Sequence, residues 1–294
     1  MKELTHTIPG GFTGKRLDKY LCDTFEIFPS RKSAYKLIKK GLVTVNGHIS
    51  APNNPVQDDD TIRIMLDNES SPVYKRKLHV LYEDQYMAIV LKPPGMLVNG
   101  NFAKTVERAL PFNLLQSNSE DALSVPAAVH RLDRSTGGLL VTAKTASAMM
   151  NLSRQFQERR VKKVYRALVN GKIQGNGIID ADVDNKEALT AYFVVDNIPS
   201  LHIKWITYLE LYPRTGRTHQ IRKHLADLGH PVLGDTQYTH TGPLLRGKGL
   251  FLWATGISLE HPVHGWLLNV RIDVPDKFYS YLKREKIRFC KFNE

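Results

Sequence analysis

From Leu78 to the end of the chain, short apolar runs alternate with a few amphipathic segments, and this pattern limits the possible folds more than any other feature. The runs have the length and composition of β-strands, whereas only three segments have helical spacing. Strands are expected at 80–82, 87–91, 139–143, 164–169, 202–211, 250–254 and 267–272, and helices at about 145–158, 217–228 and 276–286. Many strands with a minority of unevenly placed helices predict an α+β domain with a mainly antiparallel sheet.

Residues 15–66 have the pattern of a separate, compact unit. Apolar residues at three- and four-residue spacing predict a first helix within 17–25. A second helix is expected to begin after Pro29, with Ser30 as its N-cap, and to stop at Gly41.

A hairpin and a third strand are expected after these two helices. Asn46-Gly47 separates the apolar runs 43–45 and 48–49, and this pair tolerates the positive φ angles of a type I′ turn. The third strand is expected at 61–66. A polar stretch without periodicity, broken by Pro72, then predicts a linker. The expected organisation is an N-terminal domain at 1–70, a linker at 71–77 and a second domain at 78–294.

The charge of the chain favours an anionic partner. There are 41 Lys and Arg residues against 29 Asp and Glu, a formal net charge of +12, so nucleic acid is the first expectation and an anionic membrane surface the second. In the two N-terminal helices, eight basic residues against three acidic ones give a net +5, which is either a solvated surface or an RNA-binding face. These residues are Lys15, Arg16, Lys19, Arg31, Lys32, Lys36, Lys39 and Lys40, against Asp18, Asp23 and Glu26.

Several classes of protein are disfavoured by what the sequence lacks. No apolar run approaches the roughly 20 residues of a membrane span, and the start has no signal-peptide core, so a cytoplasmic protein without a membrane partner is expected. Cys22 and Cys290 are too far apart in sequence to indicate a disulfide framework or a cysteine zinc site. Phosphate-loop, dinucleotide-binding and zinc-hydrolase motifs are absent, and His219 and His224 are five residues apart, which does not align them on one helical face. We therefore expect neither a nucleotide cofactor nor a metal.

The most informative segment, 128–141, joins two apolar strands through a polar loop. Two adjacent glycines allow close backbone approach, and one carboxylate, Asp133, lies between Arg131 and Arg134. One interpretation is a turn whose acid binds local backbone amides and an arginine. The other is a catalytic carboxylate.

The order of motifs around this loop resembles that of the RluA-type RNA pseudouridine synthases. The hallmark is His130-Arg131-Leu132-Asp133, and the other matching segments are Lys92–Gly95, Lys163–Gly171, Thr215–His224, Gly229–Asp235 and His261-Pro262. The N-terminal unit resembles the small RNA-binding domain found in a ribosomal small-subunit protein, tyrosyl-tRNA synthetases and several RNA-modifying enzymes. Three departures leave the choice of substrate open: Gly138 replaces a usual Ser, Asn99-Gly100 a usual His-Pro, and Trp253 a common His.

The resemblance implies an isomerase that breaks the bond from uracil N1 to ribose C1′ and rejoins the base through C5 without a cofactor. Asp133 is the expected catalytic carboxylate, as nucleophile or as base. Tyr165 is expected to stack on the uracil, and Arg222 to keep Asp133 ionised, for which the planar guanidinium offers a bidentate grip. The structural alternatives are a half-buried strand tyrosine and a phosphate-binding arginine.

Further residues are expected to bind the RNA. Arg131 resembles the family residue that helps to hold the target nucleotide outside its helix, and His130, Lys92, Arg217 and Lys223 are additional candidates. The C-terminal segment adds further candidates for phosphate contacts: Lys283, Arg284, Lys286, Arg288 and Lys291.

The expected function is therefore an RNA pseudouridine synthase that acts as a monomer on structured RNA, with large-subunit rRNA as the first substrate and tRNA as its rival. One alternative is a non-catalytic RNA-binding or ribosome-assembly protein on a synthase-like scaffold. The joint presence of Asp133, Tyr165 and Arg222 argues against it. Another is an acid-dependent enzyme with a small-molecule substrate, which the +12 charge and the N-terminal unit disfavour.

Overall fold

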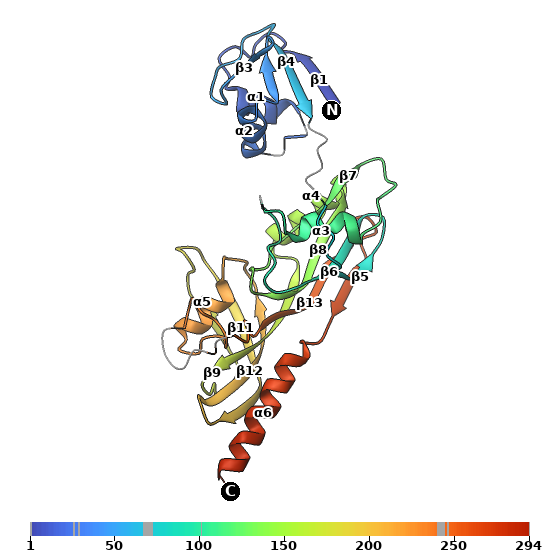
Figure 1. Cartoon of the computed structure of the whole chain (residues 1–294). Helices are drawn as coiled ribbons and strands as arrows, with labels where there is room; N and C mark the ends of the chain where they lie inside the picture. The colour runs from blue at the N-terminus through green and yellow to red at the C-terminus, as the bar shows by residue number, and fades with distance from the viewer. Residues whose placement is uncertain are drawn as a thin grey trace. The chain divides into compact units, whose positions relative to one another are not determined.

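The computed structural model divides the chain into two compact units, Met1–Pro72 and Val73–Glu294 (Figure 1). It describes residues 2–25, 27–28, 30–66, 73–100, 102–239, 245 and 247–293. The start of the expected linker, at 71–72, lies outside the described residues, as do Glu26, Pro29 and residues 67–70. The end of that linker belongs to the larger unit, because Tyr74 packs against a core cluster of that unit and its N–H donates to the Arg108 carbonyl at 2.8 Å.

The N-terminal unit packs two helices with an antiparallel sheet in the order β1-β4-β2-β3. Its elements are β1 (Lys2–Thr7), α1 (Leu17–Thr24), α2 (Arg31–Lys39), β2 (Val43–Val45), β3 (His48–Ile49) and β4 (Thr61–Leu66). The Ser30 hydroxyl caps α2 by accepting from the Ser33 N–H at 3.3 Å, as expected. Asn46 and Gly47 have φ angles of 51° and 80°, which a type I′ turn requires. The sequence analysis missed only β1 in this unit.

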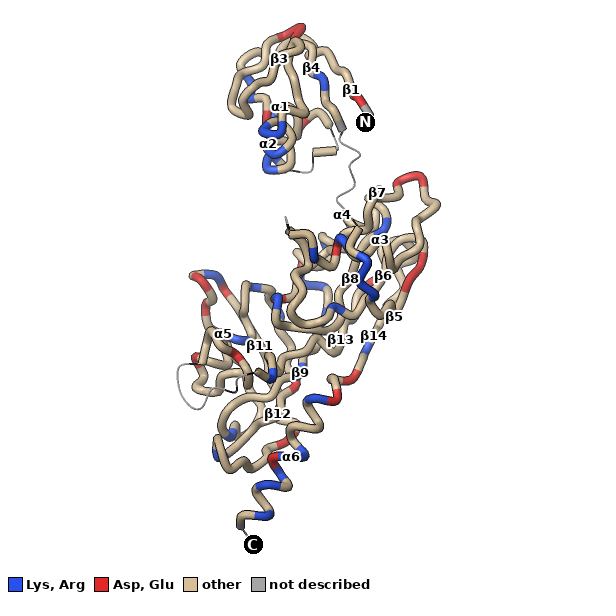
Figure 2. Tube along the Cα trace, viewed as in Figure 1, with Lys and Arg blue, Asp and Glu red and all other residues tan. Residues whose placement is uncertain are grey.

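Within the N-terminal unit, Lys and Arg residues are concentrated on α2 and on α1 with the two residues before it (Figure 2). Three of the eight expected cations form ion pairs within the unit: Lys15 with Asp23, and both Arg16 and Arg31 with Asp18. The remaining five are exposed lysines, namely Lys19, Lys32, Lys36, Lys39 and Lys40. The positive surface of this unit therefore consists chiefly of these lysines.

The larger unit is built on one mixed sheet whose described strands run in the order β10-β11-β12-β9-β13-β8-β6-β5, with β14 beside β13 and β7 beside β8. Only β8 and β13 pair in parallel within the described ranges. The elements are β5 (His79–Glu83), β6 (Met87–Lys92), α3 (Val106–Asn113), β7 (Ala122–Ala128), β8 (Gly137–Thr145), α4 (Ala146–Gln157), β9 (Lys162–Asn170), β10 (Gly177–Asp180), β11 (Leu189–Ser200), β12 (Lys204–Pro213), α5 (Gln220–Asp227), β13 (Leu252–Glu260), β14 (Leu267–Arg271) and α6 (Asp276–Asn293). The α+β class with a mainly antiparallel sheet is confirmed.

Several elements differ from the sequence expectations. The helix α3 contains Pro111, which hid its helical pattern, and begins at a cap in which the Thr105 hydroxyl accepts from Arg108 N–H. The strands β7, β10 and β11 were also missed. In β11 the pairing with β12 shifts register between Val194 and Asp196, so the alternation of inward and outward residues is interrupted. The expected strands at 202–211 and 250–254 start two residues later, and α6 extends well beyond 286.

Helices cover both faces of this sheet. Because side chains alternate along a strand, Ala167 and Val169 of β9 pack on the side of α5, and Leu168 between them packs on the side of α6. In the same way, the core around α3 and the core around α4 lie on opposite sides of β6 and β8. Tyr165 contacts both the α3 core and the α5 core. The helices α3 and α5 therefore lie over the same face, with Tyr165 between them.

Two of the departures from the family pattern meet where β8 runs beside β13. A Cβ atom on Gly137 would lie 2.2 Å from the Trp253 ring, so the absence of a side chain makes room for this indole. Gly138 has φ +123°, and a Cβ there would lie 2.2 Å from the Ala254 carbonyl oxygen. Strand β8, which follows Asp133, therefore lies so close to β13 that no side chain fits at positions 137 and 138.

Gly138→Ser is expected to destabilise the larger unit by about 2–4 kcal/mol, because it combines backbone strain with an atomic overlap. The three tryptophans all lie beyond residue 200, so their fluorescence during denaturant unfolding reports on this unit. Gly175→Ser is the matched control, since Gly175 also has a positive φ of 75°, but a Cβ atom added there would have no other atom within 4 Å. Equal losses in the two variants would contradict the explanation from close packing.

Candidate active site

A cavity of about 590 Å³ opens between the loop after β7, strand β9 and the start of α5. Six of the eight expected site residues line it: His130, Arg131, Asp133, Tyr165, Arg217 and Arg222. They come from segments up to 92 residues apart in the chain, from 130 to 222. Lys92 and Lys223 do not line this cavity.

The loop that carries Asp133 is held in place by its neighbours on both sides. Leu132 is buried in the core that includes Ala254, so the next side chain, Asp133, turns to the opposite side and faces the cavity. The Thr136 N–H closes a turn by donating to the Asp133 carbonyl at 3.1 Å. Gly95 N–H donates to the Arg134 carbonyl at 2.7 Å. The carboxylate is therefore presented by a rigid turn.

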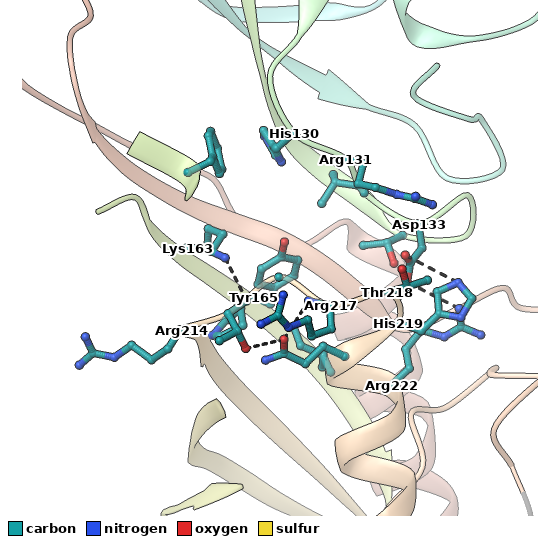
Figure 3. Close-up of a pocket in the computed structure, with 18 of the residues that line it drawn as sticks. His130, Arg131, Asp133, Lys163, Tyr165, Arg214, Arg217, Thr218, His219 and Arg222 are labelled. Carbon is teal, nitrogen blue, oxygen red and sulfur yellow. Dashed lines mark hydrogen bonds and ion pairs between the residues drawn. The ribbon is translucent and has the colours of Figure 1, made fainter. Parts of the chain in front are cut away.

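Two basic side chains from α5 approach the Asp133 carboxylate (Figure 3). Arg222 Nη1 lies 3.6 Å from Oδ2, and His219 Nε2 lies 3.8 Å from Oδ1. The guanidinium is permanently charged, whereas burial lowers the pKa of His219 against the opposing effect of Asp133. Arg222 is therefore the cation that faces Asp133 at neutral pH.

The expected bidentate grip of Arg222 on Asp133 is wrong, because the guanidinium makes that contact with Asp235 instead. Its Nε and Nη2 donate to Asp235 at 2.6 and 2.8 Å. Asp235 is 1% exposed, and burial opposes its ionisation, but the hydrogen bonds and charge of Arg222 together with the backbone N–H groups of Gln237 and Tyr238 outweigh this effect and lower its pKa. Only the third nitrogen of Arg222 is directed at Asp133. Asp235 thus holds the guanidinium in place, and the Asp133 carboxylate makes no two-point contact with it.

Tyr165 and Lys163 extend from β9 into the same cavity (Figure 3). Burial and the nearby Asp133 carboxylate raise the pKa of the Tyr165 hydroxyl, so the group stays protonated at neutral pH. Burial lowers the pKa of Lys163 to about 8. Lys163 Nζ donates to the Thr215 carbonyl at 3.2 Å. The cavity therefore holds a neutral hydroxyl close to Asp133 and, from Lys163, an ammonium group with further N–H donors.

The remaining expected residues of the cavity have different surroundings. Arg131 is exposed at the rim, and Arg217 Nε donates to the Glu187 carbonyl at 3.0 Å. His130 Nε2 accepts from the Val141 N–H at 3.0 Å, and the ring stacks on Phe156. Burial lowers the pKa of His130 to about 3, so this imidazole is neutral. These contacts make His130 a support for the loop.

The two lysines outside the cavity have protein partners. Lys92 is fully buried, and its Nζ donates to the carbonyls of Pro93, Arg134 and Thr136 at 3.1, 3.2 and 2.7 Å. All three of its N–H donors are therefore used beneath the Asp133 loop, which leaves none for RNA. Lys223 Nζ pairs with Asp184 at 2.5 Å. Lys92 is therefore unavailable as the RNA contact expected from the sequence, whereas a phosphate contact of Lys223 stays a prediction.

The sequence analysis missed three residues that organise this site: His219, Asp235 and Tyr238. The Tyr238 hydroxyl hydrogen-bonds His219 Nδ1 at 2.8 Å, and its ring lies under the Arg222 guanidinium, 4.9 Å from its centroid. The segment after Gly234 therefore positions both basic side chains that face Asp133. Asp235 ends the family segment Gly229–Asp235 found in the sequence, but that resemblance does not identify its partner.

The described residues contain no group of three or more His, Cys, Asp or Glu side chains arranged to hold a metal ion. Within the same ranges, no helix combines the length and apolar character that a membrane crossing requires.

Comparison with known proteins identifies the family. The RNA pseudouridylate synthase family matches residues 86–227, and the S4 domain matches residues 15–62. An uncharacterized RNA pseudouridine synthase of Aquifex aeolicus is 34% identical, over 92% of this chain and 94% of that protein. The chain belongs to the RNA pseudouridylate synthase family. A ribosomal large subunit pseudouridine synthase D of Nitrosomonas europaea is 33% identical, over 94% of this chain and 86% of its own length.

Membership in the RNA pseudouridylate synthase family confirms the resemblance found in the sequence, including the N-terminal domain. The structure of human RNA pseudouridylate synthase domain containing 4 has the same fold, with a TM-score of 0.57 and 24% identity over 70% of this chain and 92% of that one. This chain is thus an isomerase that acts on uridine in RNA. The non-catalytic alternative receives no support.

Proposed function

We propose that this synthase modifies large-subunit ribosomal RNA and that Asp133 is its catalytic carboxylate. The observation that carries the proposal is an aspartate facing a fixed guanidinium at 3.6 Å in a cavity that also contains Tyr165. Relatives named ribosomal large subunit pseudouridine synthase D favour rRNA over tRNA. Because one chain supplies every residue of the cavity, the proposed enzyme is a monomer, and its ribosomal substrate agrees with a cytoplasmic location.

The reaction needs an ionised carboxylate beside the sugar. The bond between N1 and C1′ breaks, the uracil turns, and C5 bonds to C1′, while C5 loses a proton and N1 gains one. Asp133 can act as a nucleophile at C1′ or as a base, and both roles require it to be unprotonated. Arg222 favours that state, because its charge persists across the working pH range and opposite charges about 4 Å apart attract by about 4 kcal/mol at an effective dielectric constant of 20.

Tyr165 and Lys163 are proposed to contact the base. The Tyr165 ring can stack on uracil, and its protonated hydroxyl can donate a hydrogen bond near the C5 proton that must leave. Lys163 can donate to a uracil carbonyl, because its ammonium group has three N–H donors. Among the described residues, only the Thr215 carbonyl accepts a hydrogen bond from it. Both side chains would orient the base as it turns.

RNA must reach this cavity with the target uridine outside its helix, since the reacting atoms are inaccessible in a stacked pair. Arg131 at the rim and Arg217 on the cavity wall are proposed to bind the phosphates of the displaced nucleotide. The exposed lysines of α1 and α2 would bind phosphates elsewhere on the RNA.

Mapping pseudouridine in total RNA from cells with and without this gene tests the substrate. We expect at least one site in large-subunit rRNA to be lost on deletion and restored by the wild-type gene, but not by Asp133→Asn. Loss confined to tRNA would contradict the proposed substrate. Restoration by Asp133→Asn would contradict the proposed catalytic residue.

A further inference from the structure

A second cavity, of about 470 Å³, lies on the other side of the loop that carries Asp133. Arg134 lines this cavity, whereas its neighbour Asp133 lines the first. The two cavities therefore share one wall. Lys92 stiffens that wall from beneath by binding the carbonyls of Pro93, Arg134 and Thr136.

The second cavity combines positive charge with aromatic side chains. Arg76, Lys104 and Arg134 line it, and none of its lining residues is acidic. Arg134 Nε donates to the Gly95 carbonyl at 3.0 Å, and its two terminal nitrogens have no protein acceptor in the described part of the chain. Tyr74 and Phe102 add two aromatic rings, of which Phe102 is 63% exposed. Cations beside aromatic rings are suited to the phosphate and the base of an unpaired nucleotide.

The walls of this cavity are firmly attached to the larger unit. Tyr74 packs against the α3 core, and the Asn113 amide donates to the Arg76 carbonyl at 2.8 Å. The segment that supplies Phe102 and Lys104 begins at Asn99-Gly100, where the sequence departs from the family pattern. The cavity thus joins a fixed scaffold to a segment that begins where the sequence departs from the usual family motif.

We propose that this cavity binds an unpaired nucleotide of the substrate RNA that adjoins the target uridine. The base would contact Tyr74 and Phe102, and its phosphate would contact Arg134 and Lys104. Flipping the target leaves its neighbours without a stacking partner, and a single strand that places uridine at Asp133 passes directly beside Arg134. The inference rests on the proposed function, because it requires an RNA substrate, and it makes this cavity a determinant of which uridine is modified.

The test combines a protein change with an RNA change. The probe is a stem-loop RNA whose loop carries the uridine identified by mapping, together with two versions that have an abasic residue immediately 5′ or 3′ of it. With wild-type enzyme, we expect one abasic version to bind about tenfold more weakly, since base stacking on an aromatic ring is worth about that much. With Phe102→Ala, the complete RNA should bind about tenfold more weakly, and that abasic change should have no further effect.

Phe112→Ala is the matched control, because Phe112 is also an exposed phenylalanine of this unit, 50% exposed, but lines neither cavity. It should retain wild-type affinity and the full effect of the abasic change. Additive effects of Phe102→Ala and the abasic residue at both flanking positions would overturn the second site, as would unchanged binding in Phe102→Ala. If wild-type enzyme forms no pseudouridine in the complete stem-loop, the proposed substrate fails instead, which separates the two conclusions.

Discussion

Asp133→Asn is expected to reduce the single-turnover rate of pseudouridine formation at least 100-fold, a loss of about 2.7 kcal/mol of transition-state stabilisation. The amide has the size of the carboxylate but can serve neither as a nucleophile nor as a base under these conditions. The turn itself should persist, because Thr136 N–H binds the backbone carbonyl of residue 133 rather than the side chain.

The rate should be measured with enzyme in excess over RNA, so that binding and product release do not limit it. RNA affinity should remain within about threefold of wild type, since Asp133 repels phosphate rather than binding it. Asp227→Asn, an exposed position at the end of α5, is the control and should keep full activity. A rate above about one per cent of wild type for Asp133→Asn would remove this residue from the chemistry.

Much of the fold could be predicted because its signals are local. Ser30 before a helix and Asn46-Gly47 between apolar runs each act through contacts within a few residues, and the structure contains both the cap and the turn. The strand β11 lacked such a signal. Its partners β10 and β12 are its neighbours in the chain, but a register shift between Val194 and Asp196 interrupts the alternation by which a strand is recognised.

Only those site residues that lie in recognisable family motifs could be predicted from the sequence. Asp133, Tyr165 and Arg222 were identified from resemblance, and the structure brings them to one cavity. The partner of Arg222 was not predictable, because an arginine that needs a carboxylate can satisfy that need with any acid that the fold places nearby. Asp235, 13 residues further along the chain, meets both donors, and nothing local in the sequence distinguishes it from Asp133.

Lys92 illustrates the same limit. A lysine beside a Pro-Pro-Gly turn in a basic, RNA-binding chain is easily interpreted as a phosphate contact. Lys92 is instead completely buried, and its ammonium group binds three backbone carbonyls. Burial lowers the pKa of Lys92 to about 8, and the charge of Asp133 opposes that change. Whether a lysine faces solvent or lies beneath a loop is determined by tertiary packing, which sequence spacing does not reveal.

Asp235→Asn is expected to lower the single-turnover rate at least tenfold and to move the acidic limb of the pH–rate profile to higher pH. Asparagine keeps the size of the side chain, but its amide nitrogen is a donor facing a donor, so the two-point contact with Arg222 is lost. Arg222 can then leave its place 3.6 Å from Asp133. Less positive charge then faces the Asp133 carboxylate, and the reaction requires the ionised form of that group.

The direction of this shift follows from the wild-type contacts. The pKa of Asp235 lies below its usual 3.8, because the hydrogen bonds and charge of Arg222 and two backbone N–H donors, from Gln237 and Tyr238, together outweigh the effect of burial. The stabilising pair is therefore present above about pH 4 and is lost only as the pH falls through the lower value in the folded protein. Across the working range of the wild-type enzyme, Asp235 stays ionised and Arg222 stays in place.

Two further variants separate positioning of Arg222 from general damage. Arg222→Lys keeps the charge but loses the two-pronged contact, so it should shift the profile in the same direction as Asp235→Asn. Tyr238→Phe removes the hydroxyl that binds His219 and leaves the ring beneath Arg222, so it should shift the profile less. Tryptophan fluorescence during unfolding would identify any variant whose larger unit no longer folds.

A phosphate-binding role for Arg222 predicts the opposite set of results. Affinity and its salt dependence would fall, while the rate at saturating enzyme and the acidic limb would stay as in wild type. Lys36→Ala serves as the reference for that behaviour, because this exposed lysine of α2 is proposed to bind phosphate and does not line the catalytic cavity. An unshifted profile with a rate within threefold of wild type in Asp235→Asn would therefore place Arg222 with the phosphate contacts. A shifted acidic limb with nearly unchanged affinity is the result expected if the guanidinium held by Asp235 acts on the ionisation of Asp133.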